Sequence, residues 1–190
     1  MMILLDADLD QDRVPRSVVG KAPRAAEFSS FRLPTALTFA RFLARARKAV
    51  KLRGQVSVLL TTDEAQRSLN RRFRGKNKPT DVLSFPADPT APGAEKIAGD
   101  LSISVPTARR QALQQGHSLS TEIKVLILHG VLHLAGYDHE TDTGQMARHE
   151  RRLRARLGLP GGLIERTAKP KPEAKSKVTA RKPAAAGRRR

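Results

Sequence analysis

The stretch TEIKVLILHGVLHLAGYDH, residues 121–139, decides how this chain folds. Its apolar residues recur at the three- and four-residue spacing of a helix, and they include Ile123, Leu126, Ile127 and Val131. Ser118 or Ser120 can cap the start of this helix. Gly136 is its expected end, because glycine readily adopts the left-handed conformation that terminates helices. We therefore predict an apolar helix, anchored in the core, that ends in a turn.

Three of the five histidines in the chain lie within this stretch: His129, His133 and His139. His129 and His133 are four residues apart, so they share one helix face about 6 Å apart along the axis. Two imidazoles placed in this way can bind one ion. The turn at Gly136 lets His139 approach that ion from another direction. We predict that the three histidines hold one metal ion.

Three protein ligands leave one position of a tetrahedral zinc ion open, which is typical of catalytic sites, whereas structural sites close all four positions. Ligation by nitrogen alone favours zinc, and it also suits nickel, copper or iron. We therefore expect one catalytic Zn²⁺ ion per chain, bound on a central helix.

The same histidine spacing occurs in metzincin proteases, whose pattern is H-E-x-x-H-x-x-G-x-x-H. In those proteases the glutamate is the general base. This chain has Gly130 at that position. A metallopeptidase is therefore an alternative that the sequence disfavours.

Outside this stretch, short alternating strands are interleaved with amphipathic helices, without a strict strand–helix–strand repeat. Strands are expected near residues 2–5, 55–60, 81–85 and 100–105, and helices near 34–52, 65–73, 106–115 and 143–157. Thr61 and Glu64 offer a capping box for the second of these helices. We predict an α+β domain with a small mixed β-sheet of about four strands, packed with several helices.

The chain carries 36 Lys and Arg residues against 18 Asp and Glu residues, a net charge of +18. Residues 167–190 contain nine of the basic residues, one acid and no aromatic residue, so we expect a disordered basic tail. Residues 1–166 should form the catalytic domain, with an irregular or inserted segment at 6–30. This domain keeps about +10, which favours a nucleic acid as the partner over a membrane.

The N-terminus lacks the features of a signal peptide, and no apolar run reaches the ~20 residues that span a bilayer. The sequence has no cysteine, which excludes disulfides and thiolate ligands. We expect a cytoplasmic protein with no membrane partner.

A basic loop at residues 74–79 follows the second helix, with Arg74, Lys76 and Lys78 as candidate substrate-binding residues and Arg74 also as the candidate catalytic residue. The planar guanidinium of Arg74 can bind two phosphate oxygens at once. His117 and His149 are assigned to the surface. Asp138 either orients a histidine ligand or serves the turn.

The stretch from His129 to His139 resembles the H-G-x-L-H-L-x-G-Y-D-H signature of the YbeY family of bacterial endoribonucleases at every fixed position. Further similar segments are Leu69–Lys76, Lys78–Pro86, Gly99–Ser104 and Thr107–Ala112. The similarity covers roughly residues 56–157.

The resemblance implies a metal-dependent, single-strand-specific endoribonuclease that acts in 16S rRNA maturation and ribosome quality control. It assigns the metal to His129, His133 and His139, and a functional role to Arg74. The expected partners are rRNA and the small ribosomal subunit, with ribosomal proteins or assembly factors as further candidates. We expect a water activated by the metal, or the RNA 2′-hydroxyl, to attack the phosphodiester bond. A non-catalytic, metal-stabilised RNA-binding factor on the ribosome is the third interpretation.

Overall fold

The computed structural model describes residues 2–10, 35–88, 90, 96–138 and 142–161. Four strands form its sheet, in the order β1-β2-β4-β3. Their bounds are Met2–Leu5 for β1, Gln55–Thr61 for β2, Val82–Pro86 for β3 and Ile97–Ser104 for β4. The first three strands in this order run parallel, and β3 pairs antiparallel with β4 at one edge. This mixed sheet confirms the predicted α+β class.

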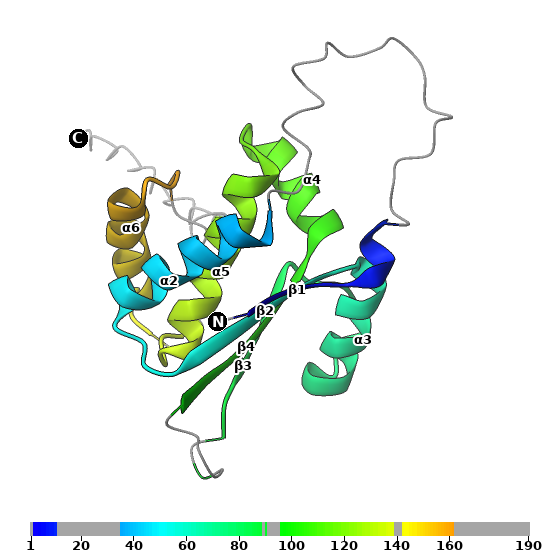
Figure 1. Ribbon diagram of the computed structural model, residues 1–190, viewed down its shortest axis with the longest axis horizontal. Helices are drawn as coiled ribbons and strands as arrows, with labels where there is room; N and C mark the ends of the chain where they lie inside the picture. Colours follow the sequence, from blue (N-terminus) through cyan, green and yellow to red (C-terminus); the bar gives the residue numbers. More distant parts are fainter. Residues whose placement is uncertain (1, 11–34, 89, 91–95, 139–141, 162–190) are drawn as a thin grey trace, which may run out of the picture.

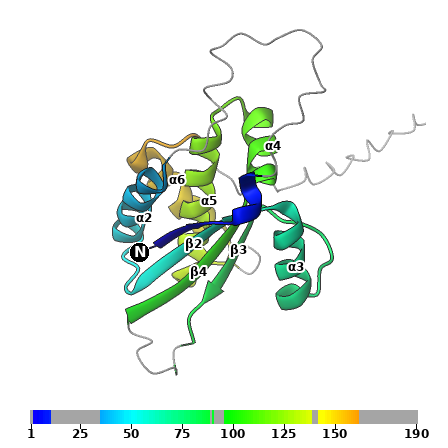
Figure 2. The ribbon, with the colours of Figure 1, turned by 45° about the vertical axis from the view of Figure 1, so that its right-hand side comes forward.

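The described helices flank this sheet unequally (Figures 1 and 2). Their bounds are Ala7–Asp10 for the 3-10 helix η1, Ala36–Val50 for α2, Asp63–Arg74 for α3, Val105–Gln115 for α4, Leu119–Leu134 for α5 and Gln145–Leu157 for α6. Helices α2, α5 and α6 lie on one side of the sheet and α3 lies on the other, with α4 near the end of the sheet where β4 leads into it. Strand β3 can therefore contact α5 on one face of the sheet and α3 on the other.

Helix α5 is the centre of the core, as predicted. All of its residues from 125 to 132 are buried. The same apolar cluster contains Phe39 and Leu43 of α2, Val58 of β2 and Leu101 of β4. Burying this much apolar surface on both sides of α5 fixes the helix against the sheet. Side chains on α5 are consequently held on a rigid support.

The caps differ in part from the sequence-based expectation. Ser118 caps α5, since its hydroxyl accepts from the Thr121 amide at 3.1 Å. The proposed capping box at Thr61 and Glu64 is wrong by one residue, because the hydroxyl of Thr62 accepts from the Ala65 amide. Thr61 instead ends β2, where its buried hydroxyl donates to Asp6 at 2.5 Å.

Asp63 ties the start of α3 to α4. Its carboxylate accepts hydrogen bonds from Ser104, from Thr107 at 2.7 Å and from Arg110 at 2.9 Å. Burial alone would raise the pKa of Asp63, but these hydrogen bonds and the charge of Arg110 together hold it below its ordinary value of 3.8. The ionised form is therefore favoured in the folded protein.

We predict that Asp63→Asn lowers the free energy of unfolding at pH 7 by about 1–2 kcal/mol, since Arg110 is partly screened by solvent. A depressed folded-state pKa stabilises the fold above the unfolded pKa, and that contribution disappears as the pH falls through the folded value. The difference between wild type and variant should therefore shrink below about pH 3.8 in denaturant titrations. Glu64→Gln, at an exposed position in the same helical turn, is the control. Equal losses in both variants would contradict the proposed network.

Most of the predicted irregular segment at 6–30, from residue 11 onward, lies outside the described residues. The predicted basic tail at 167–190 lies wholly outside them. The division of the chain at residue 166 thus stays a prediction. Within the described ranges, none of the helices has both the length and the apolar character needed to cross a membrane.

Candidate functional site

His129 and His133 project from the last two turns of α5 and meet. Their Nε2 atoms are 3.1 Å apart, and the two rings cross at 76°. His129 is 7% exposed, whereas His133 is half-buried. The structure thus brings together two of the three predicted metal ligands, with one side of the pair accessible.

Gly130 explains how the helix approaches the sheet so closely at this point. A Cβ atom at this position would lie 2.7 Å from Leu101 Cδ2 and 3.3 Å from the Ser84 hydroxyl. Any larger side chain must therefore displace the Leu101 side chain, which is packed in the core, and crowd Ser84. The glutamate of the metzincin pattern does not fit here, and this is a physical reason against the metallopeptidase alternative.

The turn predicted at Gly136 is present. Gly136 has a φ of +86°, its amide donates to His133 O at 2.9 Å, and the Tyr137 amide donates to Leu132 O at 3.1 Å. These two hydrogen bonds form the Schellman motif that reverses a chain after a helix. His139 lies outside the described residues, so its place at the ion stays a prediction. Among the described residues, no set of three or more potential ligands is gathered at one point.

Sequence reasoning missed two residues behind the histidines. Glu150 Oε2 lies 3.4 Å from His129 Nδ1, and Glu150 Oε1 accepts from Arg154 Nε at 2.7 Å. Both side chains are 1% exposed. The available signal was the position of Glu150 four residues after Met146 and three before Leu153, within the apolar stripe of α6. A charged residue in such a stripe is buried, so it needs a partner.

The ionic partners of Glu150 decide its protonation state. Burial alone would raise the pKa of Glu150, but the hydrogen bond from His129 and the charge of Arg154 together hold it below its ordinary value. An ionised carboxylate only accepts hydrogen bonds. His129 Nδ1 is therefore the donor in this contact, and a neutral ring with its proton at Nδ1 presents a lone pair at Nε2.

The donor set fits a metal ion. Two nitrogens that bind one tetrahedral zinc ion at 2.0–2.1 Å are about 3.3 Å apart, close to the 3.1 Å between the two Nε2 atoms. Two lone pairs at this distance repel each other unless a proton or a cation lies between them. The Glu150 carboxylate at His129 Nδ1 also fits a metal site, because zinc-binding histidines commonly donate their other ring N–H to a carboxylate.

The basic loop lies on the other side of the sheet. Arg74 is the last residue of α3 and not the first of the loop as predicted, because the helix ends at Gly75 in the left-handed conformation. Arg74, Lys76 and Lys78 are all exposed. The amide side chain of Asn70 donates to Lys78 O at 2.7 Å, which fixes the loop against the helix. An open cavity of about 520 Å³ lies beside it, lined by Glu64, Arg67, Ser68, Arg71, Arg72 and Asn77. This face of α3 is rich in guanidinium groups.

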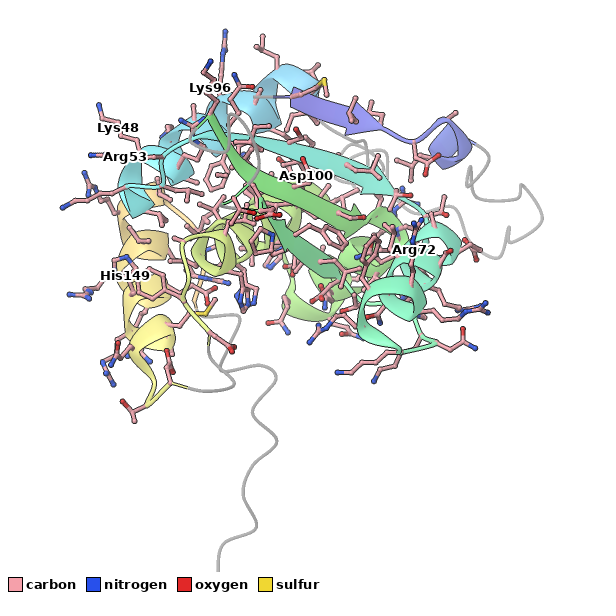
Figure 3. The ribbon with its side chains drawn as sticks, turned by 90° about the horizontal axis from the view of Figure 1, so that it is seen from below. Lys48, Arg53, Arg72, Lys96, Asp100 and His149 are labelled. Atoms are coloured by element: carbon pink, nitrogen blue, oxygen red, sulfur yellow. The ribbon has the colours of Figure 1, made fainter. Side chains whose placement is uncertain are left out.

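Strand β3 connects the two regions. The Phe85 ring contacts Phe73, in the last turn of α3, with centroids 5.0 Å apart. The neighbouring Ser84 hydroxyl donates to Gly130 O at 3.5 Å, between the two histidines on α5. Figure 3 shows Arg72 on α3 and His149 on α6 at opposite sides, with the sheet between them. The histidines and the basic loop are therefore placed around one edge strand, but on opposite faces of the sheet.

The remaining described histidines are less exposed than expected. His117 Nε2 lies 2.9 Å from the fully buried carboxylate of Glu122, and the His149 ring stacks on Tyr137 at 5.0 Å. Both histidines are half-buried, which corrects their assignment to the surface. Neither forms part of the pair at His129 and His133.

Comparison with known proteins matches residues 28–158 to the model of the family described as endoribonuclease YbeY. A relative from Koribacter versatilis, named endoribonuclease YbeY, is 57% identical over 68% of this chain and 82% of its own length. A second, from Solibacter usitatus and of the same name, is 47% identical over 76% of this chain and 97% of its own. A solution structure from Thermotoga maritima covers 83% of this chain and 89% of its own, at 21% identity and a TM-score of 0.49. The family match begins well before residue 56, where the resemblance seen in the sequence alone started.

Proposed function

Because the chain belongs to the YbeY family of endoribonucleases, we propose that it is a zinc-dependent, single-strand-specific endoribonuclease. We further propose that it acts in the cytoplasm, in 16S rRNA maturation and ribosome quality control. Its partners would be rRNA in the small ribosomal subunit, with ribosomal proteins or assembly factors. Family membership supports the coarser role, a hydrolase that cleaves RNA. The observation that carries the zinc dependence is the convergence of two imidazole Nε2 atoms at 3.1 Å on a buried helix.

His129, His133 and His139 would hold the ion. When bound, zinc lowers the pKa of a coordinated water and polarises a phosphoryl oxygen, without redox chemistry. The contribution of the chain is rigidity, because α5 is buried along both sides and the Schellman turn fixes its end. A preorganised site loses little free energy to reorganisation during the reaction.

Arg74, Lys76 and Lys78 would bind the RNA backbone. All three are exposed, and they extend the row of arginines on α3. Binding of several phosphates by such a surface releases counterions and weakens steeply with salt. Because β3 separates this surface from the histidines, we propose that the RNA strand crosses the edge of β3, with Arg74 nearest the reacting phosphate. A single strand is flexible enough to make this crossing, whereas a duplex is stiff.

The rate at which Arg74→Ala cleaves a single-stranded RNA, compared with wild type, tests this proposal. Loss of one charge-stabilising donor should lower kcat about 100-fold. Arg45→Ala, which removes an exposed arginine from α2, should leave kcat unchanged. Wild type treated with a chelator should lose cleavage and regain it when Zn²⁺ is added.

Three results would contradict the proposal. One is equal cleavage by both arginine variants, which would remove Arg74 from the reaction. Another is cleavage that survives rigorous metal removal, which would exclude zinc. The third is preferential cleavage of duplex RNA, which would contradict the crossing at β3.

A further inference from the structure

A buried chain of polar contacts runs from the histidine pair to the end of the described domain. Glu150 accepts from His129 with one oxygen and from Arg154 with the other. The guanidinium of Arg154 then donates through Nη1 to the carbonyls of Pro160, at 3.1 Å, and Gly161. Arg154 thereby links the backbone beyond α6 to Glu150.

Taken alone, such a pair is costly. Transfer of a carboxylate and a guanidinium from water into the core carries a large desolvation penalty, and an apolar pair of similar volume is often as stable. Glu150 and Arg154 are each 1% exposed, so this penalty applies to both groups. Stability therefore gives no sufficient reason for these residues. The other contact of the pair is the one between Glu150 Oε2, the oxygen that Arg154 does not bind, and Nδ1 of His129.

A neutral imidazole can carry its proton on either ring nitrogen, and only one of the two tautomers presents a lone pair at Nε2. An acceptor fixed at Nδ1 selects that tautomer and also fixes the ring plane. Arg154 binds Glu150 through Nε and Nη2, so the carboxylate cannot rotate away without breaking two hydrogen bonds. The acceptor is thus held in place by α6 and by the backbone at 160–161.

We propose that Glu150 is a positioning residue, which holds His129 in the Nδ1–H tautomer with Nε2 aimed at the metal, and that Arg154 fixes Glu150 in that role. This inference rests on the proposed zinc site at His129 and His133. It adds that the metal affinity is set in part by α6 and by the chain segment that follows it.

Two measurements on the full-length protein test the inference. Nitrogen-15 NMR of the metal-free wild type should find His129 in the Nδ1–H form, with its signals assigned by their loss in His129→Ala. Chelator competition should then find that Glu150→Gln binds Zn²⁺ roughly 10–100-fold more weakly than wild type. The matched control is Glu122→Gln, which changes a second buried carboxylate paired with a histidine, at the start of α5. This control should lose stability without losing zinc affinity.

The inference is overturned if His129 carries its proton on Nε2 in the wild type. This measurement does not depend on whether a Glu150 variant folds. It is also overturned if Glu150→Gln binds zinc as tightly as wild type, or if Glu122→Gln weakens binding equally. A wild type that does not bind zinc at all contradicts the proposed function instead. The two failures are therefore distinguishable.

Discussion

Replacement of His133 by alanine is expected to abolish zinc binding and to lower RNA cleavage about a thousandfold or more. The reason is that His133 supplies one of the two nitrogens that converge at 3.1 Å. A catalytic metal contributes several kcal/mol of charge stabilisation in the transition state, and each ~1.4 kcal/mol changes the rate tenfold. Metal content and single-turnover cleavage of a single-stranded RNA, measured on the same preparation, check this expectation.

His117→Ala is the matched control for this variant. It removes another half-buried histidine, whose partner is Glu122 at the start of α5. It should bind one zinc ion and cleave RNA at the wild-type rate, even where its melting temperature is lower. If His133→Ala cleaves RNA at a rate within a few-fold of wild type, the histidine pair has no role in the reaction.

Replacement of Gly130 should have the second large effect, on stability. In an exposed helix, glycine to alanine stabilises by about 0.5–1 kcal/mol. Here the added Cβ atom would lie 2.7 Å from Leu101 Cδ2, so we expect Gly130→Ala to destabilise by about 1–3 kcal/mol. Gly130→Glu should cost more, because it also places a carboxylate between α5 and the sheet. Urea denaturation of both variants provides the measurement.

The sign of the alanine effect is the diagnostic result. Gly161→Ala serves as the control, because no atom lies within 4 Å of the added Cβ position and its effect should be small. A stabilised Gly130→Ala would show that α5 does not approach β4 closely. Peptidase activity gained by Gly130→Glu would restore the metallopeptidase alternative.

Local features of the structure were predictable from the sequence. The spacing of His129 and His133 and the turn at Gly136 depend on residues within one helix and its end, so periodicity and glycine chemistry identify them. Strands β2 and β4 were recognised by alternation, although β4 begins three residues earlier than expected. The capping hydroxyl was misplaced by one residue, because adjacent threonines offer the same group. Contacts with residues distant in sequence, the pairing with Ser104 of β4 and the hydrogen bond to Asp6, assign Thr61 to the strand.

Long-range contacts were not predictable in this way. Nothing local in residues 82–86 indicates that β3 pairs antiparallel at the edge of an otherwise parallel sheet. For the same reason the basic loop and the histidines could not be placed on opposite faces from the sequence. Glu150 was missed because its partner His129 lies on α5, which packs against α6 only in the folded domain; Arg154 is one turn away on α6 itself. The family match supplies the activity, since many functions share similar folds.

X-ray absorption spectroscopy at the zinc edge, on the full-length protein loaded with one equivalent of Zn²⁺, tests the central claim most directly. The scattering pattern of imidazole rings counts the histidine ligands. We predict three imidazole nitrogens and one further light atom from solvent, all at roughly 2.0–2.1 Å, with one imidazole lost in a zinc-loaded His139→Ala protein. A spectrum with fewer than three imidazoles, or one unchanged by His139→Ala, would contradict the site.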